Sequence, residues 1–316
     1  MRPESNAPAI RTSGLARSFG DTAAVAGLDL DVRRGDMFGL VGPDGAGKST
    51  AIRLLCGILK PTGGAGSVLG CDLRSEPERV KRQIGYLSQN FTLYGDLTVD
   101  ENIEFFAELH GVADCRRRRD ELLEFTRLTP FRARLAQALS GGMKKKLALA
   151  CTLIHTPAIL FLDEPSTGVD PVSRGEFWSI LSGILDEGVT VFMTTPYLDE
   201  AERCHRIGLM HRGRIIRSGS PAAIRELLPG RVFDIECPAP PPAYHALRRR
   251  WSCAHLVLYG DHLRLWAPDG EADARDAVER LTREGLGPAA FRPAAPSLED
   301  VFVALLSSEP AQGGTP

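Results

Sequence analysis

The apolar positions along the chain follow two periodicities, which predict strands in some segments and helices in others. Residues 158–162 and 189–194 are short apolar runs bounded by turn or charged residues, the pattern of buried strands in a parallel sheet. Runs between residues 97 and 155 instead repeat apolar side chains every three to four positions, the period of an α-helix. A short apolar run at 37–41, a glycine-rich loop and a helical segment at about 48–59 follow one another directly. This order predicts a chain of α/β type.

Two further segments predict paired strands. Residues 10–32 have a strand-like, amphipathic pattern with glycines at the turn points. Residues 207–218 place Arg212 and Gly213 between two short strands, which predicts a hairpin. Residues 1–8, ahead of both, are expected to form a flexible tail.

The composition changes near Gly219, where a second domain is expected to follow. A proline-rich stretch, CPAPPPA, occupies 237–243 and breaks the pattern. Beyond it, a hairpin is predicted around Gly260-Asp261, followed by an amphipathic helix. A length of 316 residues also favours two domains over one. We therefore predict a small α+β domain over 223–308 and a disordered tail at 309–316.

The charge and cysteine content of the chain argue against several classes of protein. Lys plus Arg number 38 and Asp plus Glu 40, so a net charge of −2 gives no case for nucleic acid as a partner. The basic run 116–119 is interpreted as a solvated helix face, with contact to lipid headgroups as the alternative. Seven cysteines without a C-x-x-C pair argue against a disulfide framework and a zinc ribbon. With no secretory signal and no run of ~18 apolar residues, we expect a cytosolic chain that reaches a membrane only through a partner.

Residues 42–49 read Gly-Pro-Asp-Gly-Ala-Gly-Lys-Ser, the G-x-x-x-x-G-K-S pattern of a phosphate-binding loop between strand and helix. Glycines let the backbone curl around an anion, and the helix that begins near Lys48 adds its positive dipole end. Lys48 is expected to reach the β- and γ-phosphates of ATP, and the Ser49 hydroxyl to bind Mg²⁺. An ordinary glycine-rich turn is the alternative. The predicted nucleotide-binding residues in this stretch are Gly42, Asp44, Gly45, Ala46, Gly47, Lys48, Ser49 and Thr50.

Asp163 and Glu164 end a second apolar run and suggest the chemistry of hydrolysis. Asp163 fits a carboxylate that holds Mg²⁺ through water, opposite Ser49. Glu164 is expected to point the other way on an extended backbone, where it can act as a catalytic residue that polarises the attacking water. Capping of the strand end before Pro165 is the alternative. A phosphate loop alone leaves kinases, GTPases, motors and transport ATPases open, and the carboxylate pair narrows this set.

The segment Leu139–Met143, LSGGM, lies just upstream of the carboxylates and opens a predicted helix. It resembles the signature sequence of ABC ATPases. The Ser140 hydroxyl, the N–H groups of Gly141 and Gly142 and the helix N-terminus form a second anion site by the same physical logic as the phosphate loop. The resemblance implies a head-to-tail dimer that sandwiches two ATP molecules, each between the phosphate loop of one subunit and the signature of the other.

Other positions fit the same family. The resemblance assigns Gln89 to the glutamine loop, which contacts Mg²⁺ and the attacking water and also forms the contact with the membrane subunit. Residues 166–170 resemble the D-loop, which crosses the dimer interface in this family. Phe19 occupies the place of the aromatic side chain that stacks on adenine, with an ordinary core phenylalanine as the alternative.

The resemblance covers about residues 8–222 and is strongest to ATP-binding subunits of bacterial drug, antibiotic and polysaccharide exporters of the daunorubicin-resistance kind. Pro296–Phe302, PSLEDVF, is typical of the C-terminal extension in such subunits. The resemblance implies a P-loop NTPase core of the ABC ATPase type over 9–222, with a mainly parallel sheet and an inserted helical subdomain at about 90–155. The α+β domain at 223–308 would then be a regulatory or dimerisation domain.

The sequence departs from the family at Pro196, which stands where a switch histidine is expected. Proline has no side-chain donor and no N–H, so it cannot hydrogen-bond the γ-phosphate or link it to the opposite D-loop. His205 is a weak substitute, because a helix over 199–206 would carry it away. Asp44, where asparagine is more common, places a negative charge near an anion site.

The function predicted from these features is ATP binding and hydrolysis that powers a separately encoded export permease, slowed by Pro196. The subunit would work as a homodimer or with another ATP-binding subunit, cytoplasmic and peripheral on the inner face of the membrane through the permease. One alternative is a regulatory ABC subunit with little or no turnover, which Pro196 favours and the intact Lys48, Asp163 and Glu164 oppose. A soluble ABC protein of translation or DNA repair is a third, weakened because such chains usually carry two such domains or a long coiled coil.

Overall fold

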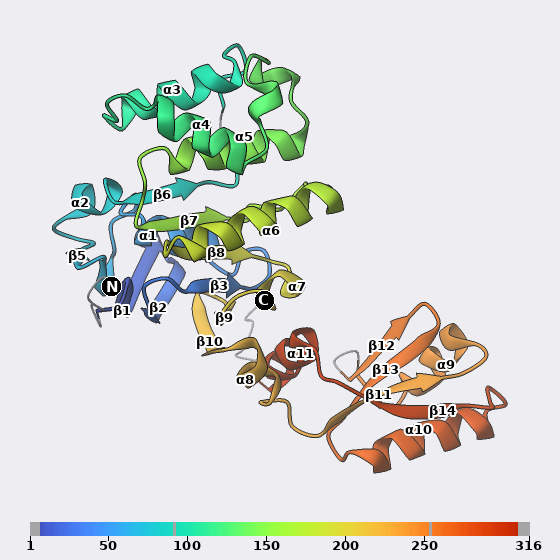
Figure 1. The fold of residues 1–316 in the computed structure, drawn as a ribbon. Coiled ribbons are helices and arrows are strands. Elements are labelled where there is room, and N and C mark those ends of the chain that lie inside the picture. The colour runs from blue at the N-terminus through green and yellow to red at the C-terminus, as the bar shows by residue number, and fades with distance from the viewer. Residues whose placement is uncertain (1–6, 91–92, 253–254, 309–316) are drawn as a thin grey trace. The chain divides into compact units, whose positions relative to one another are not determined.

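The computed structural model describes residues 7–90, 93–252 and 255–308, and Figure 1 shows their helices and strands. The chain forms two compact units, one up to Ser218 and one from Gly219 onward. Each unit has its own cluster of buried apolar side chains. No helix within the described ranges combines the length and the apolar character that a membrane crossing requires.

The central sheet of the first unit has six strands in the order β10-β9-β3-β8-β7-β6. The pairs β3–β9, β3–β8, β7–β8 and β6–β7 are all parallel, which confirms the predicted mainly parallel sheet. Strands β3, β7 and β8 are buried along their whole length, so none of them alternates apolar and polar side chains. The strands are β3 (Met37–Val41), β6 (Ile84–Leu87), β7 (Ile159–Asp163), β8 (Thr190–Thr195), β9 (Arg206–His211) and β10 (Arg214–Gly219).

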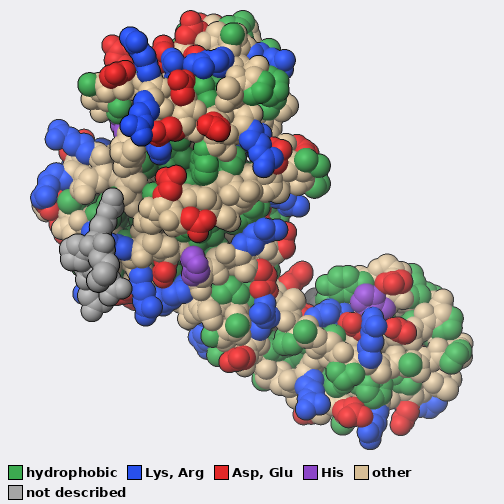
Figure 2. All heavy atoms as spheres, in the orientation of Figure 1, with side chains coloured by type: hydrophobic (Ala, Val, Ile, Leu, Met, Phe, Trp, Pro, Cys, Tyr) green, Lys and Arg blue, Asp and Glu red, His purple; other side chains and the backbone are tan. Residues whose placement is uncertain are grey.

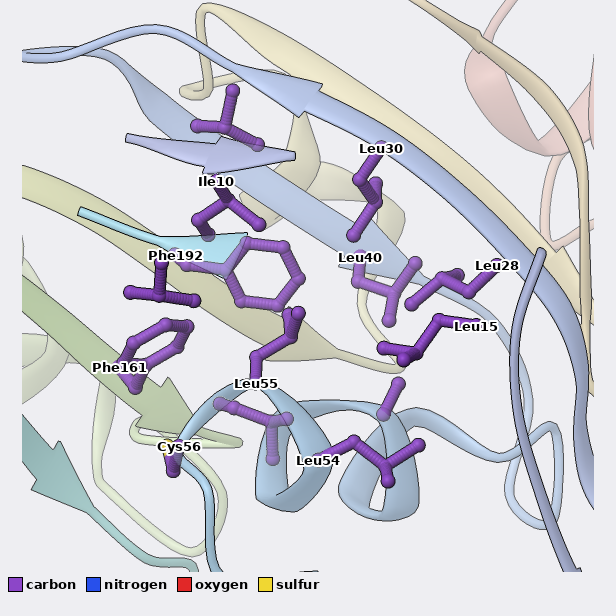
Figure 3. Packing of buried hydrophobic residues seen from close by; sticks show 14 of the residues in the cluster. Ile10, Leu15, Leu28, Leu30, Leu40, Leu54, Leu55, Cys56, Phe161 and Phe192 are labelled. Atoms are coloured by element: carbon purple, nitrogen blue, oxygen red, sulfur yellow. The ribbon is translucent and has the colours of Figure 1, made fainter. Parts of the chain in front are cut away.

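A second, antiparallel sheet, in the order β2-β1-β4-β5, completes the core of this unit. Helix α1 (Lys48–Leu55) contributes Leu54 and Leu55 to one cluster with side chains of β1, β2, β7 and β8 (Figure 3). Within it, the Phe192 ring stacks on Phe38 at 5.4 Å between centroids. The strands of this sheet are β1 (Ile10–Phe19), β2 (Thr22–Val32), β4 (Gly63–Val68) and β5 (Cys71–Asp72).

A helical part lies between β6 and β7 in the sequence. Helix α3 begins with a reciprocal capping box, in which the Thr98 hydroxyl accepts from Glu101 N and the Glu101 carboxylate accepts from Thr98 N. The elements of this part are α3 (Val99–Leu109), α4 (Arg116–Phe125), two short 3₁₀ turns and α5 (Gly141–Leu153). The short helix α2 (Pro77–Lys81) precedes it, and α6 (Pro171–Asp186) and α7 (Leu198–Ala201) follow it.

The four arginines that open α4 are each matched by an acidic side chain. Arg117 and Arg118 pair with Glu121 at 3.0 and 3.3 Å, and Arg119 pairs with Glu104. Arg116 lies 3.9 Å from Asp114. Figure 2 shows basic and acidic side chains intermingled on the visible face of this part. The side chains of Arg116 and Arg117 are 86 and 93% exposed, as a solvated helix face requires, whereas those of Arg118 and Arg119 are only 28 and 12% exposed. The interpretation of a solvated face therefore fits only the first two arginines.

The predicted hairpin at 207–218 is confirmed as β9 and β10. Its turn residues Arg212 and Gly213 have φ of 45° and 78°, the left-handed conformation that a two-residue hairpin turn favours.

The second unit contains a four-stranded antiparallel sheet in the order β12-β13-β11-β14. The predicted hairpin around Gly260-Asp261 is confirmed as β12 and β13. The proline-rich stretch is only in part a break, because α9 begins at Pro240; prolines fit the first turn of a helix, where no intrahelical N–H partner is needed. The elements are α8 (Pro221–Arg225), β11 (Arg231–Glu236), α9 (Pro240–Leu247), β12 (Leu256–Tyr259), β13 (His262–Ala267), α10 (Glu271–Arg283), β14 (Ala290–Ala294) and α11 (Leu298–Ser308).

The PSLEDVF segment forms the start of α11 and fastens it to the sheet. Asp300 N donates to the Ser297 hydroxyl, which donates to Asp300 Oδ2 at 2.8 Å. Arg264 of β13 donates to the same oxygen at 2.8 Å and to Asp234 Oδ1 at 3.3 Å. The hydrogen bond that Arg264 donates to Asp300 raises the pKa of Arg264 above its already high ordinary value. The segment therefore joins helix to sheet through a mostly buried ion pair.

Candidate nucleotide-binding site

The phosphate loop curls between β3 and α1 because two of its glycines approach neighbouring backbone closely. A Cβ at Gly42 would lie 2.2 Å from Met210 O, and one at Gly47 would lie 2.2 Å from Ala24 O. Gly45 and Gly47 also have φ of 77° and 104°, which L side chains rarely adopt. The loop thus has the curled, glycine-dependent shape that the sequence predicts, and it forms a cradle at the N-terminus of α1.

The Lys48 ammonium lies inside this cradle with only 4% of the residue exposed. Its Nζ donates to Gly42 O at 2.8 Å and to Pro43 O at 3.1 Å, and lies 3.3 Å from Glu164 Oε1. Asp44 is 3.8 Å from the same Nζ, but its side chain is 93% exposed. The negative charge at this unusual position therefore points mainly to solvent.

Ser49, Asp163 and Thr194 meet at the carboxyl ends of β7 and β8. Asp163 Oδ1 accepts from Ser49 Oγ at 3.1 Å and from Thr194 Oγ1 at 2.6 Å. Asp163 is fully buried, and its Oδ2 has no hydrogen-bond partner among the described residues. A buried carboxylate oxygen without a partner is costly, and oxygen atoms are the ligands Mg²⁺ prefers. The residues present therefore fit a hydrated magnesium ion between Ser49 and Asp163.

Glu164 faces the same cradle, and the expectation that it points away on an extended backbone is wrong. Strand β7 ends at Asp163, and Glu164 has a φ of 49°, in the left-handed region. This turn brings its carboxylate to Lys48 at 3.3 Å, while Gln89 Nε2 donates to Glu164 Oε2 at 3.0 Å. The backbone N–H of Glu164 donates to Thr194. Glu164, Gln89 and Lys48 thus form one group, with Glu164 only 7% exposed.

Lys145, five residues after Ser140, contacts this group from α5. Its Nζ donates to Gln89 O at 3.2 Å. Burial lowers the pKa of Lys145, and the negative charge of Asp163 opposes that shift. This bond connects the signature helix to the glutamine loop within one chain.

Phe19 ends β1 and is 48% exposed, so it is not an ordinary core phenylalanine. The Arg17 guanidinium lies 4.6 Å from the centre of its ring. Stacking of adenine on this ring stays a prediction. Thr50, by contrast, lies in the first turn of α1 and is partly buried.

The signature forms the N-terminus of α5, as the sequence predicts. Ser140 is the N-cap, and its hydroxyl accepts from Met143 N at 3.3 Å. Gly142 packs against α6, where an added Cβ would lie 2.2 Å from Ser173 Oγ. Ser140 and Gly141 are exposed, and within the described ranges no hydrogen bond joins them to residues 42–49.

His205 does not substitute for the missing switch histidine. Helix α7 ends at Ala201, shorter than the helix expected over 199–206. His205 is held instead by Met37 at the start of β3, where its Nδ1 accepts from Met37 N at 2.9 Å. The phosphate loop follows the opposite end of that five-residue strand, roughly 13 Å away. Pro196 itself follows the last residue of β8.

Three residues with a clear place in the site were not predicted. Thr194 holds Asp163 and Glu164, and Thr195 and the buried Glu200 hold Ser166 of the D-loop. The only signal in the sequence was two adjacent threonines at the end of a strand, which β-propensity alone also explains.

The comparisons with known proteins identify the family of this chain. A model of the ABC transporter family matches residues 25–167. The daunorubicin/doxorubicin resistance ATP-binding protein DrrA of Streptomyces peucetius is 38% identical over 303 residues, 94% of this chain and 92% of that protein. The probable multidrug ABC transporter ATP-binding protein YbhF of Escherichia coli K12 is 44% identical over 214 residues, 67% of this chain but only 37% of its own length. The chain belongs to the ABC transporter family.

Solved structures give the same fold. An ATP-binding subunit of an ABC transporter superposes with a TM-score of 0.63 at 30% identity, covering 69% of this chain and 92% of its own. The dimeric bacterial ABC transporter cassette MJ0796 superposes with a TM-score of 0.61 at 25% identity, covering 67% and 98%. The predicted P-loop NTPase core of the ABC ATPase type is therefore confirmed.

Proposed function

We propose that this protein binds and hydrolyses ATP and that closure of a nucleotide-bound dimer powers a separately encoded export permease. The observation that carries the proposal is the convergence of Lys48 and Ser49 from the start of α1 with Asp163 and Glu164 from the end of β7. Membership of the ABC transporter family, with DrrA similar over nearly its whole length, supports the same conclusion.

The loop backbone and Lys48 are suited to the phosphates. The N–H groups at the start of α1 and the Lys48 ammonium supply positive potential where the β- and γ-phosphates would lie. Lys48 would exchange its contacts with Gly42 O and Pro43 O for phosphate oxygens. Ser49, Asp163 and Gln89 would hold the magnesium ion, which when bound neutralises charge on the phosphates.

Glu164 is the proposed catalytic base. Its carboxylate is buried and held by Gln89 and Lys48, so it is aimed before any substrate arrives. Glu164 would orient a water molecule and accept its proton as the water attacks the γ-phosphate in line with the departing ADP. Binding of the phosphates by Lys48 would free Glu164 from its ion pair for this step.

A head-to-tail dimer would complete each site. Ser140 and Gly141 are exposed at a helix N-terminus, and within the described ranges they make no hydrogen bond to residues 42–49, so they would be available to the nucleotide of a second subunit. The similar cassette MJ0796 is dimeric, which supports the proposal of a dimer. Phe19, exposed beside Arg17, would stack on the adenine ring.

Contact with the permease is proposed at the helical part. Tyr94, Phe105 and Leu109 are 44, 36 and 67% exposed, and the rings of Tyr94 and Phe105 lie 4.5 Å apart between centroids, so large apolar side chains face solvent near Gln89 in sequence. A cavity of about 260 Å³, lined in part by Ile58, Tyr86 and Phe106, lies where α3 and α5 approach β6. Such a contact would hold the subunit peripherally on the cytoplasmic face of the membrane.

Residues 9–222 would be the nucleotide-binding domain and 223–308 a regulatory or dimerisation domain.

The rival proposal is a regulatory ABC subunit that binds ATP and gates its partner with little turnover. Pro196 favours it, because that position offers no donor to the γ-phosphate. The steady-state ATPase activity of the purified protein distinguishes the two proposals, with Lys48→Ala as the inactive control. Activity abolished by Lys48→Ala supports the first proposal, and ATP binding without activity supports the rival.

A further inference from the structure

A buried carboxylate joins three segments beside the predicted site. Glu200 lies in α7 and is 1% exposed. The Ser166 hydroxyl of the D-loop donates to Glu200 Oε1, and the Thr195 hydroxyl at the end of β8 donates to Glu200 Oε2 at 2.7 Å. Each carboxylate oxygen thus has a hydroxyl donor, as a buried charge requires.

The direction of these bonds is fixed by the neighbouring backbone. Thr195 Oγ1 accepts from Tyr197 N at 3.0 Å, so its own hydrogen is free to point at Glu200. Carboxylate oxygens only accept when ionised, so Ser166 must donate as well. Together the bonds set where Ser166 lies relative to β8.

The position of Ser166 matters because it is two residues from Glu164. Thr167 N donates to Glu164 O at 3.3 Å and Val169 N to Ser166 O at 3.1 Å, so the stretch is a pair of linked tight turns. A shift of Ser166 would therefore move Glu164. Among the described residues, the bond from Ser166 to Glu200 is the only hydrogen bond that joins 166–170 to 195–201.

The two threonines at the end of β8 bind different groups. Side chains alternate along a strand, so Thr194 and Thr195 face opposite sides. Thr194 holds Asp163 and Glu164, and Thr195 holds Glu200 and through it the D-loop. Pro196, the next residue, adds no donor to either side.

We infer that Glu200 is a positioning residue for ATP hydrolysis: it ties the D-loop to the end of β8 and thereby aims Glu164. The inference rests on the proposed hydrolysis. It assigns a function to a carboxylate that does not touch the nucleotide cradle. None of the hydrogen bonds that connect Ser166, Glu200 and Thr195 involves residue 196.

Kinetics of four variants test this. Glu200→Ala and Ser166→Ala should each lower kcat about tenfold, the scale of one charged hydrogen bond, while KM for ATP changes less than about twofold. The double variant should resemble Glu200→Ala alone, because both changes break one link. Asp199→Ala, the exposed neighbour on α7, is the matched control and should keep wild-type values. Additive losses, or a loss that appears in KM, would overturn the inference.

Hydrogen–deuterium exchange supplies a readout that does not depend on turnover. In Ser166→Ala and Glu200→Ala, the amides of Thr167 and Val169 should exchange about tenfold faster, while those of residues 42–49 keep their wild-type rates. Unchanged exchange at 167 and 169 would overturn the inference even if activity fell. If the wild-type protein shows no ATPase activity, the proposed hydrolysis is wrong. In that case the exchange result alone decides whether Glu200 holds the D-loop in place. Thr195→Ser, which keeps the hydroxyl, should behave as wild type where Thr195→Val does not.

Discussion

Thr194 Oγ1 donates to Asp163 Oδ1 at 2.6 Å and accepts from the backbone N–H of the next residue, Glu164, at 3.1 Å. One hydroxyl of β8 therefore fixes both acidic residues at the end of β7. With Ser49 on the same Oδ1, the second oxygen of Asp163 is left without a partner among the described residues and is buried. That oxygen is the one suited to a metal-bound water.

Replacing Thr194 should weaken metal binding more than nucleotide binding. In Thr194→Val the carboxylate of Asp163 loses a donor that orients it, and such outer partners contribute about 10- to 100-fold in metal affinity. Titration of Mg²⁺ against ATPase activity, and ATP binding in EDTA, separate the two effects. Thr194→Ser keeps the hydroxyl and is the matched control. If Thr194→Val and Thr194→Ser showed the same dependence of activity on Mg²⁺, Thr194 would not be orienting Asp163 for the metal.

Restoring a donor at position 196 should raise the rate of hydrolysis. Donors that stabilise developing charge contribute ~10²–10³ in rate where one has been removed from an oxyanion site. We expect Pro196→His to raise kcat, by up to that scale, with little change in KM. Pro196→Ala, which relieves the backbone constraint without adding a side-chain donor, is the control. A rise in both variants would trace the effect to the backbone, and no rise in either would show that residue 196 does not limit turnover.

Blocking Glu164 should trap the ATP-bound dimer. Glu164→Gln keeps the size of the side chain and its contact with Gln89 but removes the base, so ATP should stay intact between two subunits. Light scattering or gel filtration with ATP and Mg²⁺ should then report twice the monomer mass. Adding Ser140→Arg to this variant places a bulky cation at the signature and should restore the monomer. A monomer in Glu164→Gln itself, under conditions where ATP is bound, would rule out the sandwich arrangement.

The elements closest to the nucleotide cradle were the most predictable from the sequence. Strands β3, β7 and β8 are buried on both faces, so each is a short apolar run of five or six residues bounded by turn or charged residues, a length that favours a strand over a helix. The loop at 42–49 was predictable because close backbone approach at Gly42 and Gly47 tolerates no side chain. Local rules therefore determine the frame of the site.

The orientation of the acidic residues was not predictable in this way. Glu164 turns into the cradle through a φ of 49°, which a strand pattern does not anticipate. The bond between Ser166 and Glu200 joins residues 34 positions apart, and its members have no shared sequence signature. His205 failed as a substitute because α7 ends at Ala201 and the chain then returns to the start of β3. These features depend on tertiary contacts rather than on periodicity.

Breaking the ion pair at the start of α11 should destabilise the second unit. Arg264 and Asp300 have side chains only 15 and 10% exposed, so Asp300→Ala leaves a mostly buried guanidinium short of an acceptor. We expect a loss of about 1–3 kcal/mol in the free energy of unfolding. Glu271→Ala removes an exposed partner of Arg275 and should cost less than about 0.5 kcal/mol. Urea unfolding followed by tryptophan fluorescence measures both, and equal losses would contradict a special role for the pair.

The stacked histidines of the helical part should make the first unit less stable in mild acid. The rings of His110 and His155 lie 3.9 Å apart at 10°, and burial lowers the pKa of each below the ordinary value, with the charge of His155 adding to the effect on His110. The unfolded chain therefore binds more protons than the folded chain once the pH falls below about 6.5, so stability is full above that pH and declines below it.

Replacing one of the two histidines with a side chain that cannot be protonated tests this prediction directly. His110→Phe keeps an aromatic ring against His155 but cannot be protonated. The decrease in the thermal midpoint between pH 7.5 and pH 5.5 should be smaller than in wild type, roughly half if both histidines contribute equally. His245→Phe changes an exposed histidine of the second unit and should leave the wild-type decrease intact. Circular dichroism melts at the two pH values measure the difference. An unchanged decrease in His110→Phe would place the acid sensitivity elsewhere in the chain.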